Sequence, residues 1–142
     1  MKLKKLRPEC NLTTIRDGRG GIFTFYPEKP IVEFNFQFIN KGKIRGNHHH
    51  PEFDEYYLFT EGNGVVVTKS DDGLKEEFIY VGTGDCVYIP LGVSHVTYAI
   101  TDIKYVTFLT KKWDDCEIPV VHEDLGVDMG NRGDLNYRGP KQ

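Results

Sequence analysis

Turn-forming residues punctuate the chain at short and regular intervals. From about residue 22 to residue 110, clusters rich in Gly, Asn and Asp, or a Pro-Leu-Gly break, recur every ~8–12 residues. The segments between these turns are rich in aromatic and β-branched residues, and no stretch of ten residues has a convincing helical period. This pattern predicts an all-β fold, an antiparallel sandwich or barrel.

The segment Ile31–Ile39 has the clearest strand pattern. Its residues alternate strictly, with Phe34, Phe36 and Phe38 on one face and Glu33, Asn35 and Gln37 on the other. That alternation is typical of a half-buried strand. Further strands are expected at residues 22–26, 56–59, 65–68, 77–81, 86–89, 95–100 and 104–110.

Length and charge limit what the protein can be. The chain has 142 residues and a net charge of -3, so we expect a single domain over residues 1–123, an irregular tail over 124–142, and no binding of a nucleic-acid polymer. No apolar run approaches the ~20 residues of a membrane span. Residues 1–10 are basic but lack the apolar segment of a secretory signal. The three cysteines share no CxxC spacing. Both observations favour a location in the cytoplasm.

Three of the five histidines stand in one run, His48-His49-His50. On an extended chain, His48 and His50 point to the same face, while His49 points away and is expected at the surface or an interface. Glu55 can return to the side of His50, and His95 follows directly after the Pro-Leu-Gly break. Three neutral imidazoles and one carboxylate suit one divalent transition metal, whether Fe, Mn, Co, Ni, Cu or Zn, with positions left open for water or substrate.

The spacing of these residues forms two blocks. The first reads Gly42, five residues, His48-x-His50, four residues, Glu55, six residues, Gly62; the second reads Gly84, five residues, Pro90-x-Gly92, two residues, His95. Both blocks resemble the two signature motifs of the cupin superfamily, except that Ala99 stands where the second motif often has Asn. The resemblance covers about residues 22–110. It implies a small double-stranded β-helix, or jelly-roll barrel, with His48, His50, Glu55 and His95 as metal ligands.

Two further segments resemble bacterial nucleotide-sugar cupins. Asp17-Gly18-Arg19-Gly20 is similar to their DxRG segment, and residues 45–50 are similar to their RGxHxH segment. Such enzymes include dTDP-4-keto-6-deoxyglucose 3,4-ketoisomerases and dTDP-4-keto-6-deoxyhexose 3,5-epimerases. The resemblance implies a small-molecule substrate, a nucleotide-linked 4-keto sugar, that is isomerised or epimerised through an enediol or enolate. It also implies that Arg19 and Arg45 hold the diphosphate, since guanidinium pairs phosphate oxygens in a bidentate way.

The roles implied for His48 and His50 exclude each other. In the ketoisomerase-like enzymes these histidines act as acid and base, usually without a metal, whereas here Glu55 and His95 complete a ligand set. A histidine bound to metal cannot also move protons, so the metal-binding interpretation needs another group. Tyr57, two residues after Glu55 and therefore on the same inward face, is the candidate proton donor.

Other functions fit the same ligand set. They are a metal-dependent sugar-phosphate isomerase, a mononuclear iron dioxygenase, and a non-catalytic cupin that binds a small ligand. Metal content and oxygen uptake separate these classes. Small cupins often dimerise through edge strands and a swapped terminal segment, so the resemblance also implies a homodimer, with Ile31–Ile39 and the basic head as candidate contacts.

Overall fold

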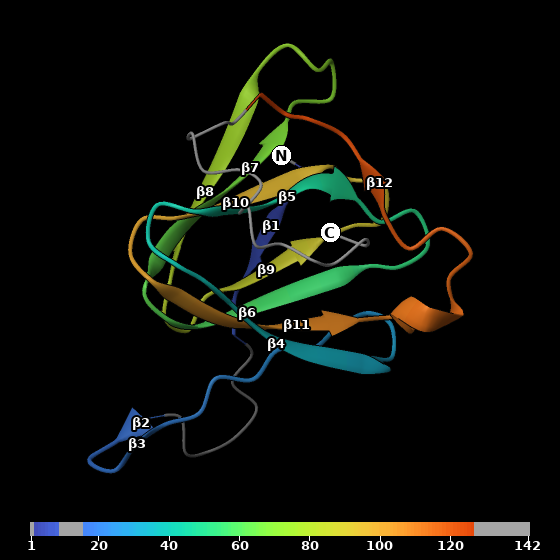
Figure 1. The fold of residues 1–142 in the computed structure, drawn as a ribbon. Coiled ribbons are helices and arrows are strands. Elements are labelled where there is room, and N and C mark those ends of the chain that lie inside the picture. Colours follow the sequence, from blue (N-terminus) through green and yellow to red (C-terminus); the bar gives the residue numbers. More distant parts are fainter. Residues whose placement is uncertain (1, 9–15, 127–142) are drawn as a thin grey trace.

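The structure, a computed structural model, describes residues 2–8 and 16–126. Two antiparallel sheets of five strands each pack face to face, and a small hairpin projects from them (Figure 1). The predicted all-β jelly-roll fold is therefore confirmed. In this part of the chain, no helix is long and apolar enough to cross a membrane. The cytoplasmic location stays a prediction.

The first sheet joins strands from both ends of the chain. Its order is β1 (Lys4–Leu6), β9 (Cys86–Ile89), β6 (Glu55–Glu61), β11 (Ile103–Leu109) and β4 (Glu33–Ile39). β6 and β11 therefore lie near its centre and β4 forms one edge. Because strands far apart in sequence alternate across this sheet, most of its contacts are long-range.

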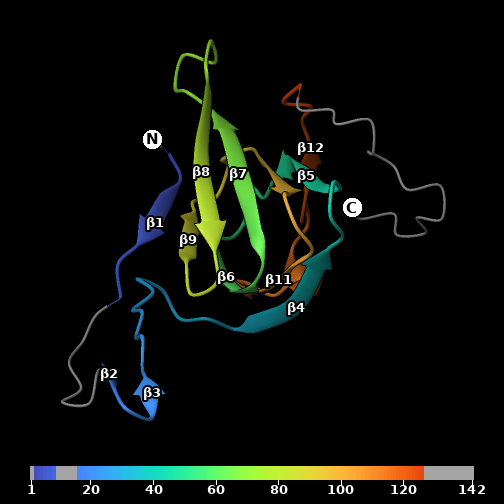
Figure 2. The ribbon, with the colours of Figure 1, turned by 90° about the vertical axis from the view of Figure 1, so that its left-hand side faces the viewer.

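The second sheet carries the histidine run. Its order is β12 (Val121–His122), β5 (Ile44–His49), β10 (His95–Ala99), β7 (Asn63–Lys69) and β8 (Glu76–Gly82). The separate hairpin pairs β2 (Arg16–Asp17) with β3 (Gly20–Gly21), and Figure 2 shows it extending away from both sheets. A single turn of 3-10 helix, η1 (Trp113–Asp115), precedes β12.

The core lies between the two sheets and fills the end of the barrel away from the histidines. Inward residues of both sheets form one apolar cluster, including Val66, Val87 and Ile103. The rings of Phe59 and Tyr105 stack within it, with centroids 5.2 Å apart. Each buried aliphatic or aromatic side chain of this kind contributes about 1.5–3 kcal/mol through removal from water. The apolar end of the barrel thus supports a polar end where a site can form.

One strand prediction needs correction. Residues 22–26 do not form a continuous strand but an irregular segment that leads from the hairpin to β4. β4 alternates as predicted, and its phenylalanine face is the exposed one, since Phe34 and Phe36 are 72% and 63% exposed. Gln37 instead points inward and contacts Tyr105 and Thr107. The barrel interior is polar here, so the polar face of the strand is the one that turns in.

The chain continues to pack after β12. Leu125 is only 2% exposed and contacts Val67 and Val96 on the outer face of the second sheet. Residues 127–142, most of the predicted tail, lie outside the described residues, so the boundary at residue 123 stays a prediction. Cys10 also lies outside them, and Cys86 and Cys116 are free thiols.

Candidate functional site

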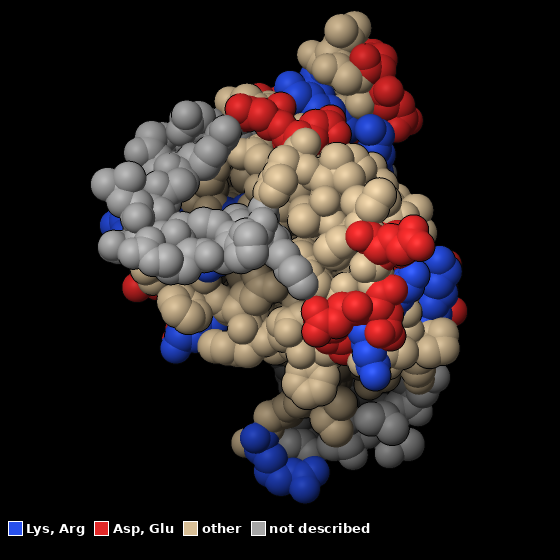
Figure 3. Space-filling view, turned by 45° about the vertical axis from the view of Figure 1, so that its right-hand side comes forward, with Lys and Arg blue, Asp and Glu red and all other residues tan. Residues whose placement is uncertain are grey.

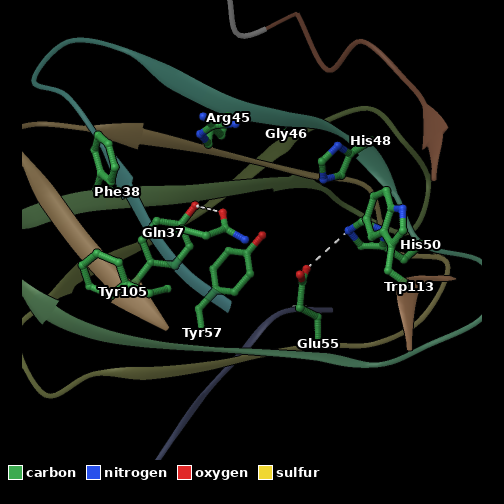
Figure 4. Close-up of a pocket in the computed structure, with 11 residues that line it drawn as sticks. Gln37, Phe38, Arg45, Gly46, His48, His50, Glu55, Tyr57, Tyr105 and Trp113 are labelled. Carbon is green, nitrogen blue, oxygen red and sulfur yellow. Dashed lines mark hydrogen bonds and ion pairs between the residues drawn. The ribbon is translucent and has the colours of Figure 1, made fainter. Parts of the chain in front are cut away.

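Four titratable side chains meet between the sheets. β5 and the residue after it supply His48 and His50, β10 supplies His95, and β6 supplies Glu55. All four side chains are buried, and His95 has no exposed surface. The sequence places them there because residues two apart on a strand share a face, and the sheets turn these faces toward each other. Figure 4 shows His48, His50 and Glu55 grouped at one end of a pocket.

Gly46 lets the two histidine-bearing strands approach each other. Its φ is +118°, and a Cβ built on it would lie 2.6 Å from the His95 carbonyl oxygen. Only glycine accepts both that conformation and that contact at no steric cost. As a result His95 pairs directly with His48 in the β5–β10 ladder, although the register shifts at the next residue.

The ligand-type atoms of the cluster are close together. One ring nitrogen from each of His48, His50 and His95 lies within 4.8 Å of the other two. Oε1 of Glu55 is 3.4 Å from Nε2 of His50 and 3.6 Å from Nε2 of His95. The three histidines and the glutamate that the sequence singled out are therefore brought together by the fold.

Backbone carbonyls orient two of the rings. Nδ1 of His50 lies 2.8 Å from the carbonyl oxygen of Pro119, and Nδ1 of His95 lies 2.9 Å from that of Val93. Because a carbonyl oxygen only accepts, each Nδ1 donates a hydrogen. The Nε2 atom of each ring then faces Glu55, placed to bind a metal ion or to donate to the carboxylate. Such carbonyl contacts are the usual way that proteins orient histidine ligands.

Burial and charge divide the cluster into neutral and ionised groups. Burial, together with the nearby rings of His95 and His50, lowers the pKa of His48 to about 2. Burial also lowers the pKa of His95, although Glu55 opposes it. Burial alone would raise the pKa of Glu55, but the neighbouring imidazole of His50 outweighs it, so the pKa falls below its usual value. Burial would likewise lower the pKa of His50, but the Glu55 carboxylate beside it raises that pKa. At neutral pH, His48 and His95 are therefore uncharged while Glu55 is a carboxylate.

Tyr57 contacts the cluster directly. Its hydroxyl lies 3.2 Å from Nε2 of His95 and donates to it, since Nδ1 of that ring already carries the hydrogen. Burial, reinforced by the negative charge of Glu55, raises the pKa of Tyr57 well above its usual value. The side chain points inward as predicted, and it is a protonated donor at neutral pH.

The cluster opens into a cavity of about 300 Å³ between the sheets. Its lining combines the cluster with polar and aromatic side chains: Phe36, Gln37, Phe38, Arg45, Gly46, His48, His50, Glu55, Tyr57, Tyr105 and Trp113. Figure 4 shows Arg45 along one side of this cavity, between Phe38 and His48, while His50 and Trp113 lie at one end. A ligand with a polar ring and an anionic group fits such a lining, since the cavity offers donors, acceptors and one guanidinium.

The two predicted arginines are placed differently. Arg45 lines the cavity, as the resemblance implied for a substrate-binding residue. Arg19 is exposed in the turn of the β2–β3 hairpin and is not among the lining residues of its own chain. His49 points away from the cavity, and its Nδ1 lies 3.3 Å from Oγ of Ser94. The sequence thus located one of the two arginines at the pocket.

Several residues of the site were not predicted. The ring of Trp113 lies against His50, with centroids 5.7 Å apart, and closes one end of the cavity. Gln37 is fixed by a hydrogen bond from the Tyr105 hydroxyl, 2.9 Å long, and by its own donation to Thr107. Its place on the polar face of an alternating strand was the available signal. Nothing in the sequence marks the Pro119 carbonyl, because its role comes from tertiary contact alone.

The donor set fits a divalent metal ion. Nδ1 of His48 and Oε1 of Glu55 are buried and have no hydrogen-bond partner among the described residues. Buried polar atoms are normally paired, and leaving one unpaired costs about 1–3 kcal/mol. Three imidazoles and a carboxylate are also the ligands preferred by first-row transition metals. His48, His50, His95 and Glu55 could therefore hold one such ion.

No protein-family model and no curated protein matches the sequence. Solved structures do match. A 3,4-ketoisomerase from Helicobacter canadensis aligns over 87% of this chain and 92% of its own, with a TM-score of 0.71 and 16% identity. A 3,4-ketoisomerase from Thermoanaerobacterium thermosaccharolyticum, a double mutant bound to TDP, aligns over 86% and 88%, with a TM-score of 0.67 and 16% identity.

A third match is a dTDP-6-deoxy-D-glucose-3,5-epimerase from Legionella pneumophila in complex with dTDP-4-keto-L-rhamnose. It aligns over 78% of this chain and 68% of its own, with a TM-score of 0.64 and 18% identity. The chain shares their fold. At identities this low the likeness establishes the fold alone, so the role of each side chain depends on the pocket of this protein.

Proposed function

We propose that the pocket binds a nucleotide-linked 4-keto sugar and isomerises or epimerises it by moving a proton beside the keto group. The supporting observation is the pocket itself, in which His48, His50, Glu55 and Tyr57 share one cavity with the guanidinium of Arg45. A cavity of about 300 Å³ suits a single sugar ring. The nucleotide then lies toward Arg45, which pairs with its diphosphate. The nucleotide ligands of two structures with this fold support the same substrate class.

The chemistry needs a proton acceptor, a proton donor and stabilisation of negative charge. Removing a proton next to a carbonyl leaves an enediolate, whose oxygen requires a cation or hydrogen-bond donors. In this proposal Tyr57, which stays protonated because of its raised pKa, returns a proton to carbon. In the metal-free protein, the acceptor is one of the two histidines of the cavity lining, His48 or His50.

We also propose that His48, His50, His95 and Glu55 hold one divalent transition-metal ion. The support is the close set of ring nitrogens and the two unpaired buried atoms. When bound, the ion supplies Lewis-acid stabilisation of the charge that develops on the keto oxygen. The three histidines are then ligands and move no protons, and Tyr57 remains the donor.

Deuterium exchange tests the isomerase proposal. The protein is incubated in D₂O with dTDP- and UDP-linked 4-keto sugars, and the carbons beside the keto group are followed by NMR. We expect deuterium at these carbons together with a changed ring configuration or keto position. Absence of exchange across the panel would contradict the proposal. If the iron-loaded protein instead consumes oxygen, the result would indicate a mononuclear iron dioxygenase.

The proposed partner is a second copy of the chain. β4 is an edge strand, and Phe34 on its outer face lies beside Phe108 of β11, with ring centroids 6.3 Å apart. Phe36 and Phe38 of the same strand are exposed, as are Ile22 and Phe23 in the segment before it. Several exposed large apolar side chains on one edge strand are typical of a protein interface. A symmetric homodimer covers such a face with its own copy.

A further inference from the structure

The carbonyl that orients His50 comes from outside the strands that form the pocket. Residues 113–126, which we call the strap, run from η1 through β12 along the edge of β5. Pro119 lies within this strap, 69 positions from His50 in the sequence. By contrast, the carbonyl that orients His95 belongs to Val93, two residues away on the same loop. The ring of His50 therefore depends on a distant segment, whereas that of His95 does not.

After Pro119, the strap is anchored on β5. Val121 pairs with His49, and His122 pairs with His48. The backbone N–H of Glu123 donates to the carbonyl of Asn47 over 2.8 Å, and Leu125 is buried beyond it. These contacts hold the strap on the C-terminal side of Pro119, so the Pro119 carbonyl lies between this anchor and the residues that precede it.

Before Pro119, the strap is held by Glu52. Oε2 of Glu52 accepts a hydrogen bond of 2.6 Å from the backbone N–H of Ile118. Oε1 of the same carboxylate accepts one of 2.7 Å from Nζ of Lys111. Bonds from N–H donors to a carboxylate are shorter and stronger than neutral ones. Glu52 follows His50 by two residues, so one short stretch of chain carries both the histidine and the group that holds its partner.

We propose that Glu52 is a positioning residue of the pocket, which holds Ile118 and so keeps the Pro119 carbonyl on Nδ1 of His50. The consequence is a defined tautomer. In the neutral ring, with the hydrogen held on Nδ1 by the Pro119 carbonyl, Nε2 of His50 keeps its lone pair toward the cluster. Without Glu52, the strap before Pro119 loosens and the ring can carry its hydrogen on either nitrogen. This inference concerns the proposed site, but its first readout requires neither a metal nor a substrate.

The experiment compares Glu52→Ala, Glu52→Gln and wild type by long-range ¹H–¹⁵N NMR of the histidine rings in the metal-free protein, at a pH where the rings are neutral. Wild type is expected to show His50 protonated on Nδ1 alone. Glu52→Ala is expected to show a mixture of both tautomers. Glu52→Gln retains an acceptor oxygen for Ile118 and is expected to restore the wild-type spectrum.

Zn²⁺ binding, measured by titration calorimetry, is expected to weaken about 10–100-fold in Glu52→Ala alone.

Two controls separate positioning from general loosening. His95 is an internal control, because its Val93 partner is independent of the strap. Glu61→Ala removes a different carboxylate, which pairs with Lys104 at the surface, and should change neither ring. An unaltered His50 tautomer in Glu52→Ala would overturn the proposal, as would equal loss of order at His95. If Glu52→Ala does not fold, Glu52→Asp applies the same test, because its side chain is one methylene shorter and holds the carboxylate away from the backbone N–H of Ile118. Absence of Zn²⁺ binding in wild type would contradict the metal proposal but not this one.

Discussion

At the scale of single residues, the pocket combines satisfied and unsatisfied groups. Nδ1 of His50 and of His95 each donates to a carbonyl, whereas Nδ1 of His48 and Oε1 of Glu55 have no partner among the described residues. Each unpaired buried atom costs about 1–3 kcal/mol. A ligand that binds these atoms recovers that free energy, so the unsatisfied pair favours binding at this end of the cavity.

Replacing Tyr57 with phenylalanine tests the proton-donor role. The variant removes one hydroxyl and the hydrogen bond to His95, so the loss in unfolding free energy should be only about 1 kcal/mol. Exchange and turnover of the keto sugar should fall about 10²–10⁴-fold, as expected for loss of a general acid. Tyr105→Phe, a second inward tyrosine of the cavity, is the matched control and should retain most activity. Undiminished exchange in Tyr57→Phe would remove Tyr57 from the mechanism.

A second residue-scale prediction concerns Asp54. Burial raises the pKa of its carboxyl, but the ion pair with Lys29 and the backbone N–H of Leu91 outweigh burial and lower it. The carboxylate therefore stabilises the fold above its unfolded pKa of about 3.9, and this stability is lost as the pH falls through the lower folded-state value.

Asp54→Asn should therefore reduce the unfolding free energy by about 1–2 kcal/mol at pH 7, a figure reduced from that of a buried pair because Lys29 is exposed. The difference from wild type should shrink as the pH falls from about 4 through the lower folded-state pKa of Asp54, because the wild-type carboxyl then becomes neutral as well. Urea unfolding at pH 7, 5 and 3 measures it. A difference that stays constant over this range would show that the charge of Asp54 does not stabilise the fold.

At the scale of elements, β5 and β10 set the geometry of the histidines. Gly46→Ala places a methyl group 2.6 Å from the His95 carbonyl in a conformation that favours glycine, so the strands must separate. We expect a loss of about 1–3 kcal/mol in unfolding free energy and weaker metal binding, since His48 moves relative to His95. Gly73→Ala, also at positive φ but in open space, is the control for backbone strain alone. Equal metal affinity in both variants would contradict this account of Gly46.

The positions of most strands could be predicted from the sequence, because turn residues and alternation are local signals. The strand Cys86–Ile89 has the predicted bounds, and the others from β6 to β11 differ by one or two residues at their ends, whereas β12 was not predicted. Which face of β4 turns inward could not be predicted, because alternation defines two faces but does not show which one faces a polar cavity. Trp113 and the Pro119 carbonyl could not be predicted either, since they join the pocket only through the path of the strap.

The exposed phenylalanine face of β4 leads to a prediction about the dimer. Phe34, which is 72% exposed and lies beside Phe108, is on the face assigned to the second copy. Phe34→Glu should convert the dimer to a monomer, as measured by light scattering, because it buries a charge at the interface. Leu74→Glu, at an exposed turn, is the control and should leave the dimer intact. A wild-type protein that is monomeric at all accessible concentrations would remove the dimer proposal.

At the scale of the whole molecule, the two ends of the barrel differ in polarity. One end of the barrel is an apolar core, and the other is a polar pocket that the strap closes. Figure 3 shows acidic and basic side chains interspersed over one outer face, in contrast to the grouped titratable residues inside. Residues from β5, β6 and β10 meet at the cluster, so a ligand there joins both sheets.

Metal binding should therefore stabilise the entire fold. An ion that binds only the folded state at a hundredfold excess over its Kd adds about 2.7 kcal/mol to the unfolding free energy. Removal of the ion with a chelator should lower the melting temperature in wild type, and re-addition should restore it. Glu55→Ala lacks one ligand and should show little response. A melting temperature that is independent of chelator and metal would mean that the cluster does not couple an ion to folding.

The most direct measurement is the metal content of the purified protein and of two variants, His50→Ala and Glu55→Ala. It tests whether His48, His50, His95 and Glu55 act together as one centre. We predict about one divalent transition-metal ion per wild-type chain and close to none in either variant, with all three proteins folded. A wild-type protein that takes up no metal even after loading, or full retention of metal in both variants, would contradict the central claim.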